Sequence, residues 1–206
     1  MTIIVDAKYV RAVATWLPLC KANDKFTSLS KVALWAGEGS LTTMVTDRYR
    51  MIHSVVSLPS VTETNDKPVL IGMDLFTRFV AAAKTLPDNS PVTIEVGANS
   101  VWLTTTSGLT LSDEVSSASY PDLPGWVAKW QRAENNVAPN FKWEMKRLAD
   151  LHKLADPNEG VFTAAKRDYA WNVTCGDAEE YSAAWRFDQG SPDTFAVYVM
   201  PMSDKR

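Results

Sequence analysis

The sequence lacks the short motifs by which many enzymes are recognised. Its 206 residues contain no glycine-rich phosphate-binding loop, no serine-nucleophile elbow and no HExxH zinc pattern. His53 and His152 have no carboxylates or thiols at ligand spacing, which favours structural roles for both. Asp47 beside Arg48 and Arg50 could be a catalytic carboxylate, but an ion pair at a strand end is the commoner arrangement. We therefore predict no catalytic residue, no metal and no cofactor, which makes an enzyme the weaker class.

Cysteine, long apolar runs and excess charge are also scarce. The two cysteines, Cys20 and Cys175, stand alone, as is typical of reduced structural thiols in a cytoplasmic protein. No apolar run approaches the ~20 residues of a membrane span, and the N-terminus has no basic segment leading into an apolar one. The formal net charge of −3 argues against a protein that binds nucleic acid through bulk charge. We therefore expect a cytoplasmic protein without a membrane partner.

One order of elements, strand–helix–strand–strand–strand, is predicted three times at spacings of about 65 to 70 residues. The first round has a strand at 2–6, a helix at 7–17 and strand-like runs at 31–39 and 40–58. The second has a strand at 69–72, a helix at 74–86 with Asp74 as N-cap, and strands at 92–97, 100–106 and 109–117. A loop is expected at 119–126, and the third round has a helix at 141–155 and strands at 160–165, 168–175, 181–187 and 195–201.

The three predicted helical segments carry net charges of +3, +1 and +2, although the whole chain is acidic. Their cations are candidate DNA contacts: Lys8, Arg11, Lys21, Arg78, Lys84, Lys142, Lys146, Arg147 and Lys153. A solvated helix face is the ordinary explanation for any one of these helices. Because all three agree in sign, they also favour a surface that binds phosphates loosely and without reading sequence.

Three short stretches resemble the bacterial sliding clamp family, the β subunit of DNA polymerase III. VTDRYRMIHSVV resembles the TDG/RxR[LM] strand of the clamp's middle domain, SYPDLPGW resembles its FPDY loop, and VYVMPM resembles the closing YVVMPMRL. The three occur in the family's order. The chain continues after its Met-Pro-Met with Ser203-Asp204-Lys205-Arg206, where the family tends to stop.

The resemblance implies an α+β fold of the DNA-clamp (processivity-fold) type, in which repeated β-α-β-β-β half-units place their helices on one face of antiparallel sheets. Residues 1–127 would be one complete clamp-like domain of two half-units, 128–136 a connector, and 137–206 a half-domain ending in the C-terminal strand. The family's other half-units have no counterpart here, a shortening that would suit a clamp encoded by a phage.

The resemblance also implies an apolar groove where partner proteins dock a short peptide. Carried over by position, its walls would be Thr46, Arg48, Tyr49, Arg50, Met51, Pro121, Trp126, Tyr198, Val199, Met200, Pro201 and Met202. Methionine is flexible and polarizable, which suits a surface that accepts several peptides.

The function implied is that of a DNA sliding clamp, a non-enzymatic processivity factor that encircles duplex DNA. Its partners would be duplex DNA without sequence preference, the replicative DNA polymerase, other clamp-binding peptides and a clamp loader. Family rings contain twelve half-units, so three in each chain favour a head-to-tail homotetramer. The alternative is a clamp-like decoy or inhibitor that binds such peptides, or a host clamp, without encircling DNA.

Overall fold

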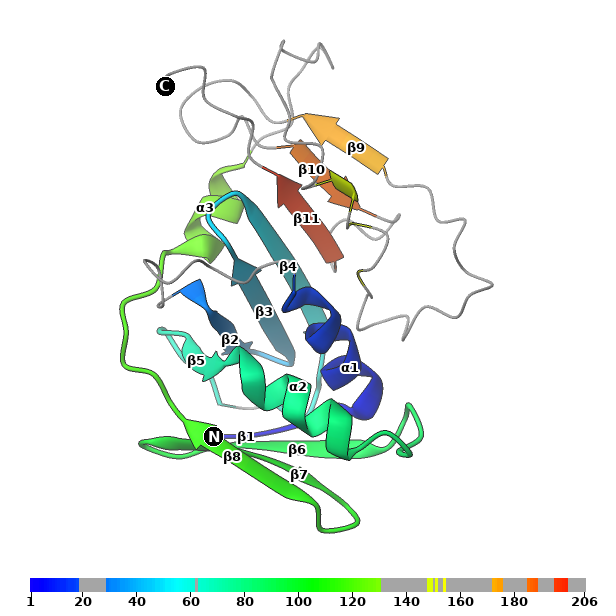
Figure 1. Cartoon of the computed structure of the whole chain (residues 1–206). Coiled ribbons are helices and arrows are strands. Elements are labelled where there is room, and N and C mark those ends of the chain that lie inside the picture. The colour runs from blue at the N-terminus through cyan, green and yellow to red at the C-terminus, as the bar shows by residue number, and fades with distance from the viewer. Residues whose placement is uncertain are drawn as a thin grey trace.

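The computed structural model describes residues 1–18, 29–61, 63–130, 148–149, 151, 154, 172–175, 185–188 and 195–199 (Figure 1). The first half-unit comprises β1 (Thr2–Asp6), α1 (Ala7–Trp16), β2 (Lys31–Gly37), β3 (Ser40–Thr46) and β4 (Arg50–Ser57). The second comprises β5 (Val69–Gly72), α2 (Met73–Ala82), β6 (Pro91–Val96), β7 (Ser100–Thr105) and β8 (Thr110–Glu114). Then follow α3 (Leu123–Lys129), β9 (Asn172–Cys175), β10 (Trp185–Asp188) and β11 (Phe195–Val199).

The strands form two antiparallel sheets, and the two half-units exchange their first strands. One sheet has the order β1-β6-β7-β8, and the other has the order β5-β2-β3-β4-β11-β10-β9. Thus β1 of the first half-unit lies beside β6 of the second, while β5 lies beside β2. Because each half-unit supplies the outer strand of the other's sheet, the described residues of β1 to β8 fold as one interlocked body.

Helices α1 and α2 lie side by side and cover one face of the two sheets (Figure 1). Their apolar residues recur at helical spacing, so one stripe of each helix is buried. In α1 this stripe includes Tyr9, Val13 and Trp16, and in α2 it includes Phe76 and Phe79. Together with alternate residues of the strands, these side chains form the main hydrophobic core.

A smaller apolar cluster lies on the opposite face of the seven-stranded sheet. Its buried members are Met44, Met51, Ala196 and Tyr198, each of which alternates along its strand with a residue of the main core. Residues of α3 pack against this cluster. The sheet is therefore covered on both faces around the line where β4 meets β11.

The structure confirms much of the predicted element order and differs from it at four places. Helix α2 ends at Ala82 and not at residue 86, because residues 83–86 form a turn. The run 40–58 is divided into β3 and β4 by a turn at Asp47–Tyr49. Helix α2 begins at Met73, directly after β5, and its N-cap residue is Gly72 without a side-chain cap bond; the assignment of Asp74 as N-cap is wrong because the strand leads into the helix with no intervening turn. Part of the loop expected at 119–126 is helix α3, whose first turn contains Pro124.

The third predicted helix, at 141–155, lies almost entirely outside the described residues, as does the strand expected at 160–165. Strands β9 and β11 fall within two of the predicted strands of the third round, and β10 overlaps the strand predicted at 181–187 and extends one residue beyond it. The predicted boundaries of the domains and connector stay predictions. Within the described segments, no helix combines the length and apolar content needed to cross a lipid bilayer.

Candidate functional site

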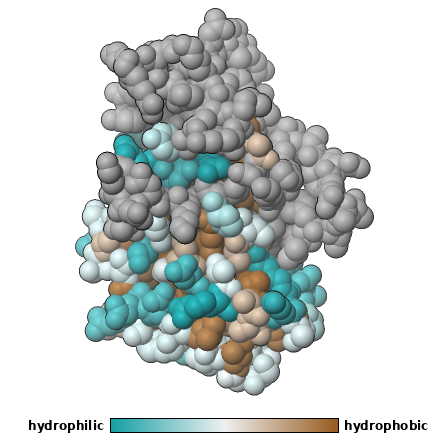
Figure 2. Space-filling view, viewed as in Figure 1, coloured by the Kyte–Doolittle hydropathy of each residue, from teal (hydrophilic) through white to brown (hydrophobic). Residues whose placement is uncertain are grey.

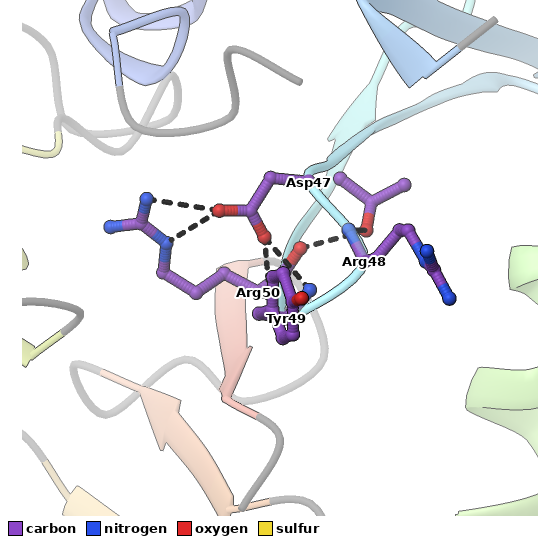
Figure 3. A network of polar contacts seen from close by, with 5 residues as sticks. Asp47, Arg48, Tyr49 and Arg50 are labelled. Atoms are coloured by element: carbon purple, nitrogen blue, oxygen red, sulfur yellow. Dashed lines mark hydrogen bonds and ion pairs between the residues drawn. The ribbon is translucent and has the colours of Figure 1, made fainter. Parts of the chain in front are cut away.

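The turn between β3 and β4 is built around the carboxylate of Asp47 (Figure 3). Its Oδ1 accepts hydrogen bonds from the backbone N–H groups of Tyr49 and Arg50, at 2.9 and 2.6 Å. Its Oδ2 accepts from Nε and Nη2 of Arg50, at 3.2 and 3.0 Å. The ion pair expected at a strand end is therefore present, and both side chains are mostly buried. Paired in this way, the Asp47 carboxylate has the arrangement of a turn-forming group.

Thr46 and Arg48 complete the turn. The Thr46 hydroxyl donates to the carbonyl of Arg50 at 2.7 Å and accepts from the backbone N–H of Arg48 at 3.1 Å. Arg48 has a φ of +80°, in the left-handed region that an L-residue seldom adopts. A residue keeps this backbone conformation only where surrounding hydrogen bonds hold it. Such strained residues are frequent at functional sites. The turn thus directs the Arg48 side chain away from Asp47 (Figure 3).

A largely apolar pocket of about 290 Å³ opens beside this turn. The residues that line it come from the turn, from the segment at the start of α3 and from one more distant residue: Leu29, Thr46, Arg48, Arg50, Met51, Pro121, Asp122, Leu123 and Trp126. The structure therefore brings together six of the predicted groove residues around one cavity.

The remaining predicted groove residues have other positions. Tyr49 is 47% exposed and does not line the pocket. Tyr198 and Val199 are buried in β11, paired with Met51 and Arg50 of β4. Met200, Pro201 and Met202 lie outside the described residues.

Three lining residues were missed by reasoning from the sequence. Asp122 and Leu123 directly follow Pro121, so continuing the wall along the chain would have found them. No local pattern singles out Leu29, because it reaches the pocket only through folding.

Helix α3 joins the pocket to the third predicted half-unit through two tryptophans. Trp126 lies edge-on to Tyr198 with ring centroids 5.2 Å apart, and Trp130 makes a second edge contact at 5.8 Å. The Asp122 carboxylate accepts from the N–H of Gly125 at 2.9 Å and so caps the start of this helix. The wall of the pocket is therefore held on β11 by aromatic packing.

Three of the four described candidate DNA contacts lie next to acids. Lys8 is 3.9 Å from Asp6, and Arg78 is 3.9 Å from Asp113. The Arg11 side chain is 17% exposed and donates to the carboxylate of Asp88. It also donates to the carbonyl of Leu86.

Lys84 is exposed just after α2, whereas Lys21, Lys142, Lys146, Arg147 and Lys153 lie outside the described residues. Figure 2 shows hydrophilic and hydrophobic residues interspersed over the face that carries α1 and α2. Cations paired with acids attract phosphate less than isolated ones, so the described helices contribute only a weak positive field.

The solved structures similar to this chain are bacterial sliding clamps. The Bacillus subtilis DNA polymerase sliding clamp superimposes with a TM-score of 0.69 at 11% identity, over 98% of this chain and 64% of that one. The fold of this chain is the sliding-clamp fold. No protein-family model matches the sequence, and no curated protein does either.

Two further clamps extend this comparison. The DNA polymerase III β subunit from Borrelia burgdorferi, in complex with a natural product, has a TM-score of 0.66 at 12% identity and matches 99% of this chain and 64% of its own. The Pseudomonas aeruginosa clamp bound to griselimycin has a TM-score of 0.64 at 12% identity, over 98% and 65% of the two chains. This chain thus has the clamp fold, predicted from three short motifs, but spans just under two thirds of these clamps.

Proposed function

We propose that this protein is a DNA sliding clamp, a non-enzymatic processivity factor of the cytoplasm. The observation that carries the proposal is the apolar pocket beside the β3–β4 turn in a clamp fold. The turn leads into β4, and β11 pairs with the edge of that strand. The pocket would dock a peptide of the replicative polymerase, while a closed ring of several chains would surround duplex DNA. Such a ring holds DNA topologically, so strong phosphate contacts are unnecessary.

The pocket suits an extended peptide with apolar anchor residues. Met51, Leu123 and Trp126 offer apolar surface, and soft or aromatic side chains of this kind dominate binding at peptide grooves. Arg48 adds a cation to the lining, so a carboxylate near the anchor would improve the fit. We extend this groove to Tyr49, Tyr198, Val199, Met200, Pro201 and Met202 as the sequence predicts.

The first test separates topological from electrostatic DNA binding. The protein is loaded, with a clamp loader, on nicked circular duplex DNA, and the DNA is then cut once. A sliding clamp should remain on the circle and leave the linear molecule by its ends. Equal retention on both forms, with loss on raising the salt, would indicate phosphate binding alone and contradict the ring.

The second test concerns the pocket and uses griselimycin, which the Pseudomonas aeruginosa clamp binds. We expect the parent chain to bind it and Met51→Ala to weaken binding at least tenfold, about 1.4 kcal/mol. Ile4→Ala removes a similarly apolar side chain, 48% exposed and outside this pocket, and should leave the affinity unchanged. Equal affinities of all three proteins would refute the groove assignment.

The alternative of a decoy or inhibitor has one specific observation in its favour. Three of the four described helix cations, Lys8, Arg11 and Arg78, have an acidic neighbour. A decoy needs the pocket but no attraction to DNA. It would bind griselimycin, and it would not remain on circular DNA after loading.

A further inference from the structure

The two described half-units have the same strand registers, so individual residues can be matched between them. β1 and β5 both lead directly into a ten-residue helix, and counting back from the first helical residue matches Ile4 with Leu70. The pairing with the next strand agrees, because Ile4 lies opposite Thr93 and Leu70 lies opposite Ala33. Both of these partners are four residues before the glycine at the start of the following hairpin turn.

The ends of β4 and β8 match in the same way. The last residue of each strand pairs with the first residue of the strand before it. The residue that follows is Leu58 in one half-unit and Val115 in the other, and its N–H donates to a carbonyl in the turn between the second and third strands. Pro59 is therefore the equivalent of Ser116.

The two half-units differ by one hydrogen bond at these equivalent places. In the second half-unit the N–H of Ser116 donates to the carbonyl of Leu70 at 3.1 Å, and Leu70 is 2% exposed. In the first half-unit Pro59 has no N–H to donate, and Ile4 is 48% exposed. The chain itself thus closes the edge of β5 beside its helix, whereas the same edge of β1 is open among the described residues.

The Ile4 carbonyl points toward this open edge. Met1 and Val96 exchange two backbone hydrogen bonds, at 2.8 and 3.1 Å. Because bonded and non-bonded pairs alternate along antiparallel strands, Ile3 and Val5 also bond to β6, and the backbone groups of Ile4 point away from it. No described strand pairs with this side of β1. An unpaired edge of this kind is a template for another segment of chain.

A cavity of about 240 Å³, here called the β1 cavity, lies beside the open edge. Its lining comes from the end of β1, the first turn of α1 and the end of β4, and includes the apolar residues Ile4, Val56 and Leu58. The two charged lining residues, Asp6 and Lys8, lie 3.9 Å apart. Since their charges are opposite, the β1 cavity favours a ligand without net charge.

The second half-unit shows what kind of segment closes such an edge. Val115 packs against the main core, and Ser116 supplies the N–H. The chain then continues to Tyr120, whose ring centroid lies 6.3 Å from that of Trp35. Residues 115–120 are neither helix nor strand and contain no charged side chain. The closing segment therefore combines an apolar side chain with the N–H of the residue that follows it.

We propose that the open end of β1 is a second docking site, which binds an extended, uncharged segment of a partner protein. The segment donates a backbone N–H to the Ile4 carbonyl, as Ser116 does to Leu70, and places an apolar side chain in the β1 cavity. Backbone bonds to a strand edge supply affinity in such complexes, and side-chain pockets supply specificity.

This site and the pocket beside the β3–β4 turn lie at opposite ends of β4. Met51 lines the pocket and Ser57 lines the β1 cavity, and six residues of strand span about 20 Å. Two partners can therefore bind one chain at the same time. The second site does not depend on the proposed clamp function.

A labelled copy of residues 115–120 is the probe, because the chain uses this segment at the equivalent place. The peptide Val-Ser-Ser-Ala-Ser-Tyr carries an uncharged fluorophore at its N-terminus and an amide at its C-terminus. Its fluorescence anisotropy is measured while the full chain is added to about 1 mM. The control peptide is N-methylated at its first serine, which removes the N–H that corresponds to Ser116 and leaves every side chain unchanged.

Three variants of the protein locate the binding. Ile4→Ala removes the exposed apolar side chain at the edge, and Pro59→Ser restores the N–H by which the chain can close the edge itself. Met51→Ala changes only the other pocket and is the matched control. We expect the parent and Met51→Ala to bind the peptide equally. Ile4→Ala and Pro59→Ser should bind it about fivefold more weakly, as should the parent with the methylated peptide, because one hydrogen bond contributes a factor of this order.

Three results would overturn the proposal. The first is no binding by the parent, or equal affinity for the methylated peptide. The second is weaker binding by Met51→Ala, which would place the peptide in the pocket beside the β3–β4 turn and leave the clamp function standing. The third is a native mass, measured by light scattering without peptide, that falls in Pro59→Ser, since the edge would then be occupied by a second copy and not by a partner. Failure of the DNA-retention test would refute the clamp and leave this site unaffected.

Discussion

Tyr198 is the side chain on which the packing of α3 against the sheet depends. It is 2% exposed, and the rings of Trp126 and Trp130 contact it edge-on. Each such aromatic pair contributes about 0.5–1.5 kcal/mol beyond its buried area. Tyr198→Leu keeps an apolar side chain and loses both pairs, so we expect the free energy of unfolding to fall by about 1–3 kcal/mol. Tyr198→Phe keeps both rings and should lose clearly less.

The measurement is urea unfolding followed by circular dichroism for the parent, both Tyr198 variants, Trp126→Leu and the double variant with Tyr198→Leu. If the rings interact as described, the two leucine substitutions should be non-additive by at least 0.5 kcal/mol. Additive effects, or equal losses for Tyr198→Phe and Tyr198→Leu, would refute the aromatic link. The pocket wall would then be held by other contacts.

Three further predictions concern polar side chains and their hydrogen bonds. Burial raises the pKa of Tyr9 well above its ordinary value near 10, and the bond with Thr43 acts in the opposite direction. Because the folded chain binds this proton more tightly, the stability it contributes is complete below pH 10 and is lost above it, by about 1.4 kcal/mol per pH unit. Tyr9→Phe should remove that slope in unfolding curves at pH 9 to 11; an unchanged slope would exclude Tyr9 as its source. Arg11→Ala should destabilise the fold by about 1.5–3 kcal/mol because two charge-assisted bonds to the 86–88 segment are lost, and a thermal midpoint equal to the parent's would contradict this. Asp47→Ala should release the β3–β4 turn and weaken griselimycin binding at least tenfold, whereas Asp47→Asn, which retains an acceptor, should lose less; the reverse order would argue against the turn as the support of the pocket.

Several features could be predicted from the sequence because they depend on neighbouring residues. The apolar stripe containing Tyr9 and Val13 predicts α1 nearly to its observed bounds, and alternation predicts β6 and β7. The resemblance placed Thr46, Arg48 and Pro121 in one groove, and the structure gathers them around one cavity. The three motifs, in the order of the clamp family, thus predicted the fold correctly. The sequence identity with the clamps compared above is only 11–12%.

Other features could not be predicted because they depend on residues distant in the chain. Nothing near Leu29 marks it as a pocket residue, and nothing near Arg11 shows that its guanidinium bonds to the carboxylate of Asp88. A turn was not expected within 40–58, since the apolar residues on both sides of Asp47 read as one run. Its strained Arg48 is stabilised by bonds that only the folded hairpin provides.

The sequence by itself determined the buried faces of α1 and α2 and the alternation of strands such as β6 and β7, because side-chain periodicity acts over a few residues. The tertiary structure decided which strands are neighbours: β1 beside β6, β5 beside β2, and β4 beside β11 across about 140 residues. Strands pair through backbone hydrogen bonds, which are the same for every residue type except proline. Which strands become neighbours therefore depends on which strand edges are still unpaired once the two helices are packed on the sheets. The same competition for edges joins β4 to β11 and leaves β8 open among the described strands.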